Sequence, residues 1–130
     1  MRFFLNFFLI CLVVSSSCSN TIKPEELHGR WNYIKLDNTN PQDSLPDGEL
    51  ELQSPAIIFN NKQDLIIEWG GKTLSSGKFR MEGKMIRYTE DLPGGQKREF
   101  PFLIKSLNGK ELVFQTMEQN ATTVTARKER

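Results

Sequence analysis

Short alternating segments separated by turn-forming residues are the feature that most constrains the fold of this chain. From Leu27 onward, β-branched, aromatic and aliphatic residues alternate with polar ones, and Gly, Asn, Asp and Pro interrupt the pattern. Asn108-Gly109 is among the strongest short signals for a hairpin turn. The pattern contains no convincing amphipathic helix. It predicts eight strands, at residues 29–36, 55–60, 64–69, 73–81, 84–90, 97–105, 111–117 and 122–128.

The order of these segments favours an all-β fold, an antiparallel up-and-down barrel. Short connections between consecutive strands suit sequential hairpins, and closure of the sheet removes its exposed edges. An eight-stranded barrel has an interior large enough for side chains or for one small ligand. A β-sandwich is the alternative, but its Greek-key crossings need longer loops, and only the loop Asp37–Leu52 is long enough.

The first eighteen residues have the pattern of an export signal. Met1-Arg2 is positively charged, residues 3–14 are apolar apart from Asn6, and three serines lead into Cys18. The apolar stretch is shorter than the roughly 20 residues that a membrane-spanning helix needs. The segment resembles the signal peptide of bacterial lipoproteins, which implies that residues 1–17 are cleaved and that Cys18 is acylated. The alternative is an ordinary secretory signal that leaves a free thiol.

Cysteine count and charge constrain the chain beyond this signal. The chain has two cysteines, and removal of the signal takes away Cys11, so no pair remains for a disulfide. There are 17 Lys and Arg against 16 Asp and Glu, and loss of Arg2 leaves the remainder formally neutral. Neutrality excludes the basic footprint of nucleic-acid binding and leaves acyl chains on Cys18 as the membrane attachment. We expect a tether at 18–26 and one domain at 27–130.

The predicted location is the bacterial envelope. In some bacterial groups an acidic cluster after the lipidated cysteine directs lipoproteins to the cell exterior, and Ser19-Asn20-Thr21 contains no acidic residue. The resemblance to lipoproteins therefore implies an exported, membrane-anchored protein that faces the periplasm.

The predicted domain contains four short motifs, Leu27-His28-Gly29-Arg30-Trp31, Ile58-Phe59-Asn60-Asn61, Ser76-Gly77-Lys78-Phe79 and Leu107-Asn108-Gly109-Lys110-Glu111-Leu112. With these motifs the segment 27–128 resembles the lipocalin-like lipoproteins of Bacteroidota. The resemblance implies a barrel that binds a small hydrophobic ligand. It also implies that Trp31 plugs one end of the barrel and that Arg127, on the last strand, stacks over the Trp31 ring through a cation–π contact.

Residues suited to catalysis or metal binding are scarce. His28 is the only histidine, which excludes a histidine-dependent triad or a multi-histidine metal site within the chain, and we interpret it as a surface or turn residue. The carboxylate pairs Glu49 and Glu51, and Glu90 and Asp91, have no motif that supports a glycosidase role. The acids of the long loop do not have the spacing of a calcium loop. We therefore predict no enzyme activity, no catalytic residue, no cofactor and no metal.

Aromatic side chains alternate on several predicted strands and leave two functions open. The first function is the binding of a small hydrophobic ligand in a pocket that these side chains line, with the loop 37–52 as a lid. The alternative is an interaction module that presents its surface to an envelope protein, and it would suit a barrel that these side chains mostly fill, as we expect them to. The side chains predicted to line such a pocket are Trp69, Tyr88, Phe102 and Phe114.

Overall fold

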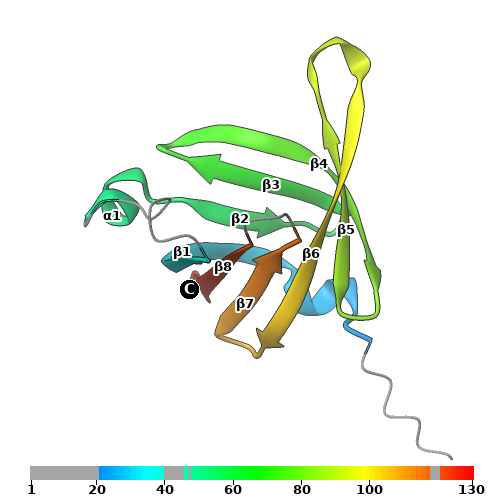
Figure 1. Cartoon of the computed structure of the whole chain (residues 1–130). Coiled ribbons are helices and arrows are strands. Elements are labelled where there is room, and N and C mark those ends of the chain that lie inside the picture. Colours follow the sequence, from blue (N-terminus) through cyan, green and yellow to red (C-terminus); the bar gives the residue numbers. More distant parts are fainter. Residues whose placement is uncertain (1–20, 40–45, 47, 118–120) are drawn as a thin grey trace, which may run out of the picture.

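The computed structural model describes residues 21–39, 46, 48–117 and 121–130. It contains all eight predicted strands, each within a few residues of its expected bounds (Figure 1). The strands are β1 (Gly29–Asn38), β2 (Ala56–Phe59), β3 (Asp64–Trp69), β4 (Lys72–Glu82), β5 (Met85–Asp91), β6 (Lys97–Leu107), β7 (Glu111–Thr116) and β8 (Thr122–Lys128). The short helices are the 3₁₀ helices η2 (Pro24–Leu27) and η4 (Pro93–Gly95) and the α-helix α1 (Glu49–Gln53).

The strands form one closed antiparallel barrel. Each strand pairs with its neighbours in sequence, and β1 also pairs with β8 to complete the ring. Among the described strands, closure therefore leaves no free sheet edge. The predicted up-and-down barrel is confirmed, and the pairing of β1 with β8 excludes the β-sandwich.

The barrel has a closed end and an open end. The closed end carries η2, the β2–β3, β4–β5 and β6–β7 turns and the C-terminus, whereas the open end carries α1, η4 and the β3–β4 turn (Figure 1). The backbone N–H of Ile22 donates to the carbonyl of Gly83 at 3.0 Å, and Leu27 is fully buried. Within the segment predicted to be a tether, the residues from Ile22 onward therefore pack against the closed end.

Large apolar side chains fill the barrel from the closed end to its middle. Trp31 is 0% exposed and donates its indole N–H to the carbonyl of Leu27 at 2.8 Å. Phe59 and Phe79 pack edge to face, with ring centroids 5.1 Å apart. Burial of side chains of this size contributes about 2 kcal/mol each. The remaining buried apolar side chains of this core are Ile57, Leu65, Ile86, Tyr88, Phe102, Ile104, Leu112, Phe114, Val124 and Ala126.

A β-bulge in β1 keeps the inner face of that strand apolar. The register against β8 shifts between Tyr33 and Lys35, so Ile34 is the extra residue, and it is 42% exposed. Before the bulge Tyr33 faces the interior, and after it Leu36 does, because both pack against the core. Without the bulge, strict alternation would place Lys35 inside the barrel.

The helix α1 begins in the segment that the sequence predicted to be a loop, and it ends one residue beyond that segment. It begins after Gly48, whose φ of 84° is left-handed, and Glu49 and Glu51 in its first turn complement the helix dipole. A helix of five residues is too short to produce the periodic pattern that reveals helices in a sequence. In the part of the chain that the structure describes, no helix has the length and apolar character needed to cross a membrane.

Gly77 lies where β4 and β5 approach closely, and this approach can be tested. A Cβ at Gly77 would lie 1.9 Å from the carbonyl oxygen of Thr89, so even alanine would clash with the backbone. We expect Gly77→Ala to lower the free energy of unfolding by about 3 kcal/mol, measured by chemical denaturation followed by circular dichroism. Gly109→Ala is the matched control, because its Cβ would meet no atom within 4 Å. Equal losses in the two variants would contradict this account of Gly77.

Candidate ligand pocket at the open end

A pocket lies within the open end of the barrel and has a volume of ≈ 300 Å³. Phe102, Phe114 and Val124, all buried, form its inner wall, and Leu74, which is 66% exposed, lies at its rim. The other lining residues are Tyr33, Leu36, Asn38, Ile67, Trp69, Thr116 and Thr122. None of the lining side chains carries a charge, so the pocket suits an uncharged and mainly apolar molecule.

Three of the four residues predicted to line a pocket do so. Trp69 comes from the end of β3, and Phe102 and Phe114 come from β6 and β7, with their rings edge to face and 5.6 Å apart. Tyr88 does not line the pocket. Its buried ring stacks on that of Phe102 with centroids 6.0 Å apart, so it supports the wall from behind.

A chain of hydrogen bonds holds Tyr88 in this position. The hydroxyl of Ser75 donates to Glu90 Oε2 at 2.5 Å and lies 2.6 Å from the Tyr88 hydroxyl, which therefore donates to Ser75. Arg98 donates to the other carboxylate oxygen of Glu90 at 3.0 Å. Burial raises the pKa of Tyr88 to about 12, and the negative charges of Glu90 and Asp91 act in the same direction. The hydroxyl of Tyr88 is committed to the wall and is not available to a ligand.

Tyr33 places a polar group in the apolar wall. Its ring packs edge to face on Phe114, with centroids 6.1 Å apart. Burial raises the pKa of the Tyr33 hydroxyl above its usual range. Within the described part of the chain this hydroxyl forms no hydrogen bond. It is therefore the group best placed to bind a polar atom of a ligand.

Hydrogen bonds at the rim connect three strands. The hydroxyl of Thr122, on β8, donates to Asn38 Oδ1 on β1. The backbone N–H of Thr122 donates to the hydroxyl of Thr116, on β7, at 2.9 Å. These bonds fix one side of the entrance, where a ligand would enter.

Several lining residues escaped the sequence analysis for identifiable reasons. Tyr33 and Leu36 are three positions apart, so strict alternation placed them on opposite faces, and the bulge at Ile34 brings them to the same face. Thr116 and Thr122 looked like ordinary polar strand ends. Ile67, in contrast, follows the simple alternation, because it lies two residues before Trp69 on the same face of β3.

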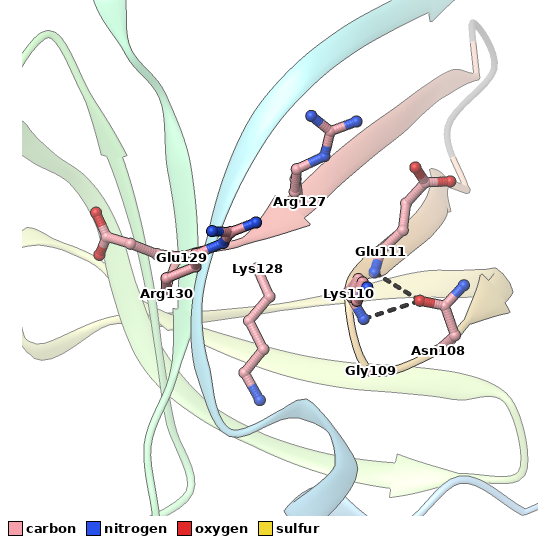
Figure 2. A pocket seen from close by; sticks show the side chains of 8 residues that line it. All are labelled: Asn108, Gly109, Lys110, Glu111, Arg127, Lys128, Glu129 and Arg130. Atoms are coloured by element: carbon pink, nitrogen blue, oxygen red, sulfur yellow. Dashed lines mark hydrogen bonds between the residues drawn. The ribbon is translucent and has the colours of Figure 1, made fainter.

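At the closed end, the cation over Trp31 is Lys128, not Arg127. The Nζ atom of Lys128 lies 5.4 Å from the centroid of the Trp31 ring. Along β8, Ala126 and Lys128 share the inward face, whereas Arg127 is exposed, and Figure 2 shows Arg127 and Lys128 on opposite sides of the strand. The predicted Trp31–Arg127 pair is therefore wrong, because Arg127 has the outward position in the alternation. A Cβ at Gly29 would lie 2.9 Å from Lys128 Cε, so glycine leaves room for this side chain.

A larger hollow, of ≈ 640 Å³, lies at the closed end between the β6–β7 turn and the end of β8 (Figure 2). Asn108 Oδ1 accepts hydrogen bonds from the backbone N–H groups of Lys110, at 2.8 Å, and Glu111, at 2.9 Å, which fixes the turn. Six charged residues line this hollow: Lys110, Glu111, Arg127, Lys128, Glu129 and Arg130. Such walls suit a charged surface rather than an apolar ligand.

The remaining sequence candidates take part in local hydrogen bonds and ion pairs. Glu49 accepts a hydrogen bond from the amide of Gln53 at 2.8 Å, and Asp91 pairs with Lys97 at 2.6 Å. In the described residues, no group of three or more His, Cys, Asp and Glu side chains is arranged to hold a metal ion. Cys18 lies outside the described residues, so its acylation stays a prediction.

Comparisons with known proteins show a distant structural likeness. No family model and no curated protein matches the chain. Two solved structures of bovine odorant binding protein are similar at 19% identity. The complex with a selenium-containing odorant has a TM-score of 0.48 and covers 84% of this chain and 74% of its own. The complex with the natural ligand has a TM-score of 0.44 and covers 81% and 72%. At these scores, the assignment of the fold rests on the strand pairing of this chain itself.

The two tyrosines provide a pH test of the folded barrel. Burial raises the pKa of Tyr88 to about 12 and also raises that of Tyr33, whereas in the unfolded chain both should ionise near pH 10. The unfolded chain therefore releases these protons first, and the stability that they contribute below pH 10 is lost as the pH rises toward 12. Ultraviolet titration of phenolate absorbance should show both tyrosines mostly protonated at about pH 11 in the folded protein. A phenolate midpoint near pH 10 in the folded state would contradict their burial.

Proposed function

We propose that this domain binds a small, uncharged, mainly apolar molecule inside the open end of the barrel. The observation that carries the proposal is the pocket of ≈ 300 Å³. Ligand pockets in proteins generally measure about 300–1,000 Å³ and combine apolar and aromatic walls with a few polar groups. This pocket is at the lower end of that range, so its ligand is small.

The composition of the wall supports an uncharged ligand. A charged molecule would give up its hydration for neutral surroundings, and no side chain that lines the pocket would offset that cost. Trp69 and Phe102 offer aromatic surface, and the Tyr33 hydroxyl offers one hydrogen bond. A molecule with an apolar body and a single hydroxyl or carbonyl group fits this arrangement best.

The pocket also bears on the second candidate function, that of a filled barrel that contacts an envelope protein. The exposed side chains of Leu52 and Met117, near the open end, favour a protein partner. Single exposed apolar residues are common on protein surfaces, however, and carry less weight than a pocket. Ligand binding is therefore the better supported of the two functions.

We further propose that the protein is exported and is held in the bacterial envelope, on the periplasmic side, by acyl chains on Cys18. The proposal rests on the order of positive charge, apolar stretch, small residues and cysteine in residues 1–18. More than one acyl chain makes such an anchor stable.

Ligand binding can be tested with the apolar fluorophore N-phenyl-1-naphthylamine and two matched variants. Leu74→Glu places a carboxylate at the rim of the pocket, and Leu52→Glu makes the same change at a side chain that is 75% exposed and does not line the pocket. We expect Leu74→Glu to weaken binding about tenfold, because it removes apolar contact and introduces a group that must stay hydrated. Fluorescence titration should show no change for Leu52→Glu.

Native mass spectrometry of the protein purified from its own host is the complementary measurement. A small molecule that co-purifies with the wild type and is depleted in Leu74→Glu would support the proposal. Equal affinities of the two variants for the fluorophore would argue against this pocket, and a ligand-free protein that does not bind the fluorophore would refute the function.

The anchor is tested by Cys18→Ala. Because Cys18 is the only cysteine after the predicted signal, this variant should lose all acyl labelling and move from the membrane fraction to the soluble fraction. Metabolic labelling with a fatty acid and fractionation of the cells measure both effects. Retention of the unlabelled variant in membranes would contradict the lipid anchor.

A further inference from the structure

Ion pairing divides the basic side chains of this protein into two groups. Many of those on the barrel wall pair with carboxylates, as Arg30 does with Glu68 and Lys97 does with Asp91, both at 2.6 Å. Within the described residues, the basic side chains without a salt bridge are Lys23, Lys62, Lys72, Lys84, Lys105, Lys110, Arg127, Lys128 and Arg130. All of them except Lys72 lie at the closed end of the barrel.

These closed-end residues form what we call the basic collar: Lys23, Lys62, Lys84, Lys105, Lys110, Arg127, Lys128 and Arg130. Every hairpin turn at this end contributes to it, since Lys62, Lys84 and Lys110 lie in the β2–β3, β4–β5 and β6–β7 turns. All members except Lys128 are exposed, and Figure 2 shows the side formed by the end of β8 and the β6–β7 turn.

Acidic residues at the same end do not cancel the collar. Glu82 pairs with Arg87 at 3.4 Å, and Glu129 pairs with Arg30 at 3.7 Å, so both are balanced by arginines outside the collar. Glu25, Glu26 and Glu111 also lie at this end and form no salt bridge within the described residues, so the eight basic side chains of the collar outnumber the unpaired acidic ones by eight to three. The chain is nearly neutral as a whole, but its unpaired positive charge is concentrated on one end of the barrel.

The chain also enters the barrel at this end. The docked part begins at Ile22, whose N–H binds the carbonyl of Gly83 in the β4–β5 turn. Cys18 is four residues earlier, and even a fully extended chain of that length spans no more than about 14 Å. An acyl group on Cys18 therefore brings the closed end close to the bilayer, whatever the conformation of the residues between them.

We propose that the basic collar is a docking face for the anionic headgroups of the membrane that holds Cys18. This inference rests on the lipidation proposed above and adds an orientation to it. The acyl chains supply attachment, and the collar fixes the barrel with its closed end against the headgroups. Two independent observations support a lipid surface as the occupant: the short reach from Cys18 and the opposite charge of anionic lipids.

Docking at the closed end points the ligand pocket away from the membrane. The three longest strands, β1, β4 and β6, have 10 or 11 residues. At a tilt of about 40° they give a barrel height of roughly 25 Å. The open end therefore lies beyond the headgroup layer, and the ligand exchanges with the aqueous compartment rather than with the bilayer.

The orientation can be measured on the lipidated protein in vesicles of phosphatidylcholine with or without phosphatidylglycerol. With Cys18 acylated, a cysteine introduced by Gly109→Cys or by Leu52→Cys is the only free thiol for a fluorescent label. Both sites tolerate a label, because a Cβ at Gly109 meets no atom within 4 Å and Leu52 is largely exposed. A headgroup-linked quencher should quench the label at 109 severalfold more than the label at 52 when phosphatidylglycerol is present, and high salt should reduce the difference.

Charge position is tested by two triple variants with the same net charge. Lys62→Gln, Lys84→Gln and Lys110→Gln remove part of the collar, and Lys35→Gln, Lys72→Gln and Lys97→Gln remove exposed lysines elsewhere. Each collar lysine lost should lower the ratio of docked to undocked domains roughly fivefold. The first triple variant should therefore lose the part of the quenching at 109 that depends on phosphatidylglycerol, and the second should keep it.

The outcomes separate the docking face from the anchor. A protein that floats with phosphatidylcholine vesicles but shows equal quenching at both labels, or stronger quenching at 52, overturns the docking face and leaves the anchor intact. Equal effects of the two triple variants overturn it as well, as would a collar that binds a soluble acidic protein and not the vesicles. A protein that does not float with phosphatidylcholine vesicles lacks the anchor, and both proposals then fail.

Discussion

The pairing of β1 with β8 is the interaction on which the rest of this structure depends. It joins the first and last strands, closes the barrel and creates two ends with different chemistry. The same pairing sets Trp31 opposite Lys128 at the closed end, and Asn38 opposite Thr122 at the entrance of the pocket. A chain that failed to close would therefore lose the plug, the rim and the pocket together.

Local pattern was enough to predict the strands, their order and the barrel, because alternation and turn residues act within a few positions of each other. It was not enough where one residue changes the register. The bulge at Ile34 reverses the alternation in β1. Tyr33 and Leu36 therefore line the same wall of the pocket, although the sequence pattern places them on opposite faces of the strand. The alternation along β8 places Lys128, and not Arg127, on the same face as the buried Ala126, so the pattern itself indicates Lys128 as the cation over Trp31.

The interior shows why both expectations for the aromatic residues were partly right. From the closed end to the middle, rings and aliphatic side chains pack without need of a ligand. Beyond Phe102 and Phe114 the strands continue, the lining includes the polar side chains of Asn38, Thr116 and Thr122, and a pocket remains. Position along the barrel axis decides whether an apolar side chain is core or wall, and that position depends on tilt and register, which no single segment of sequence reveals.

The two tryptophans give the barrel an optical reporter at each end. Trp31 is sealed in the closed end, with its indole N–H bonded and a lysine over its ring, so its emission should respond only to loss of the fold. Trp69 lies partly exposed in the wall of the pocket, where its surroundings change with occupancy. Tryptophan fluorescence can thus distinguish ligand binding at the entrance from unfolding of the core without any added label.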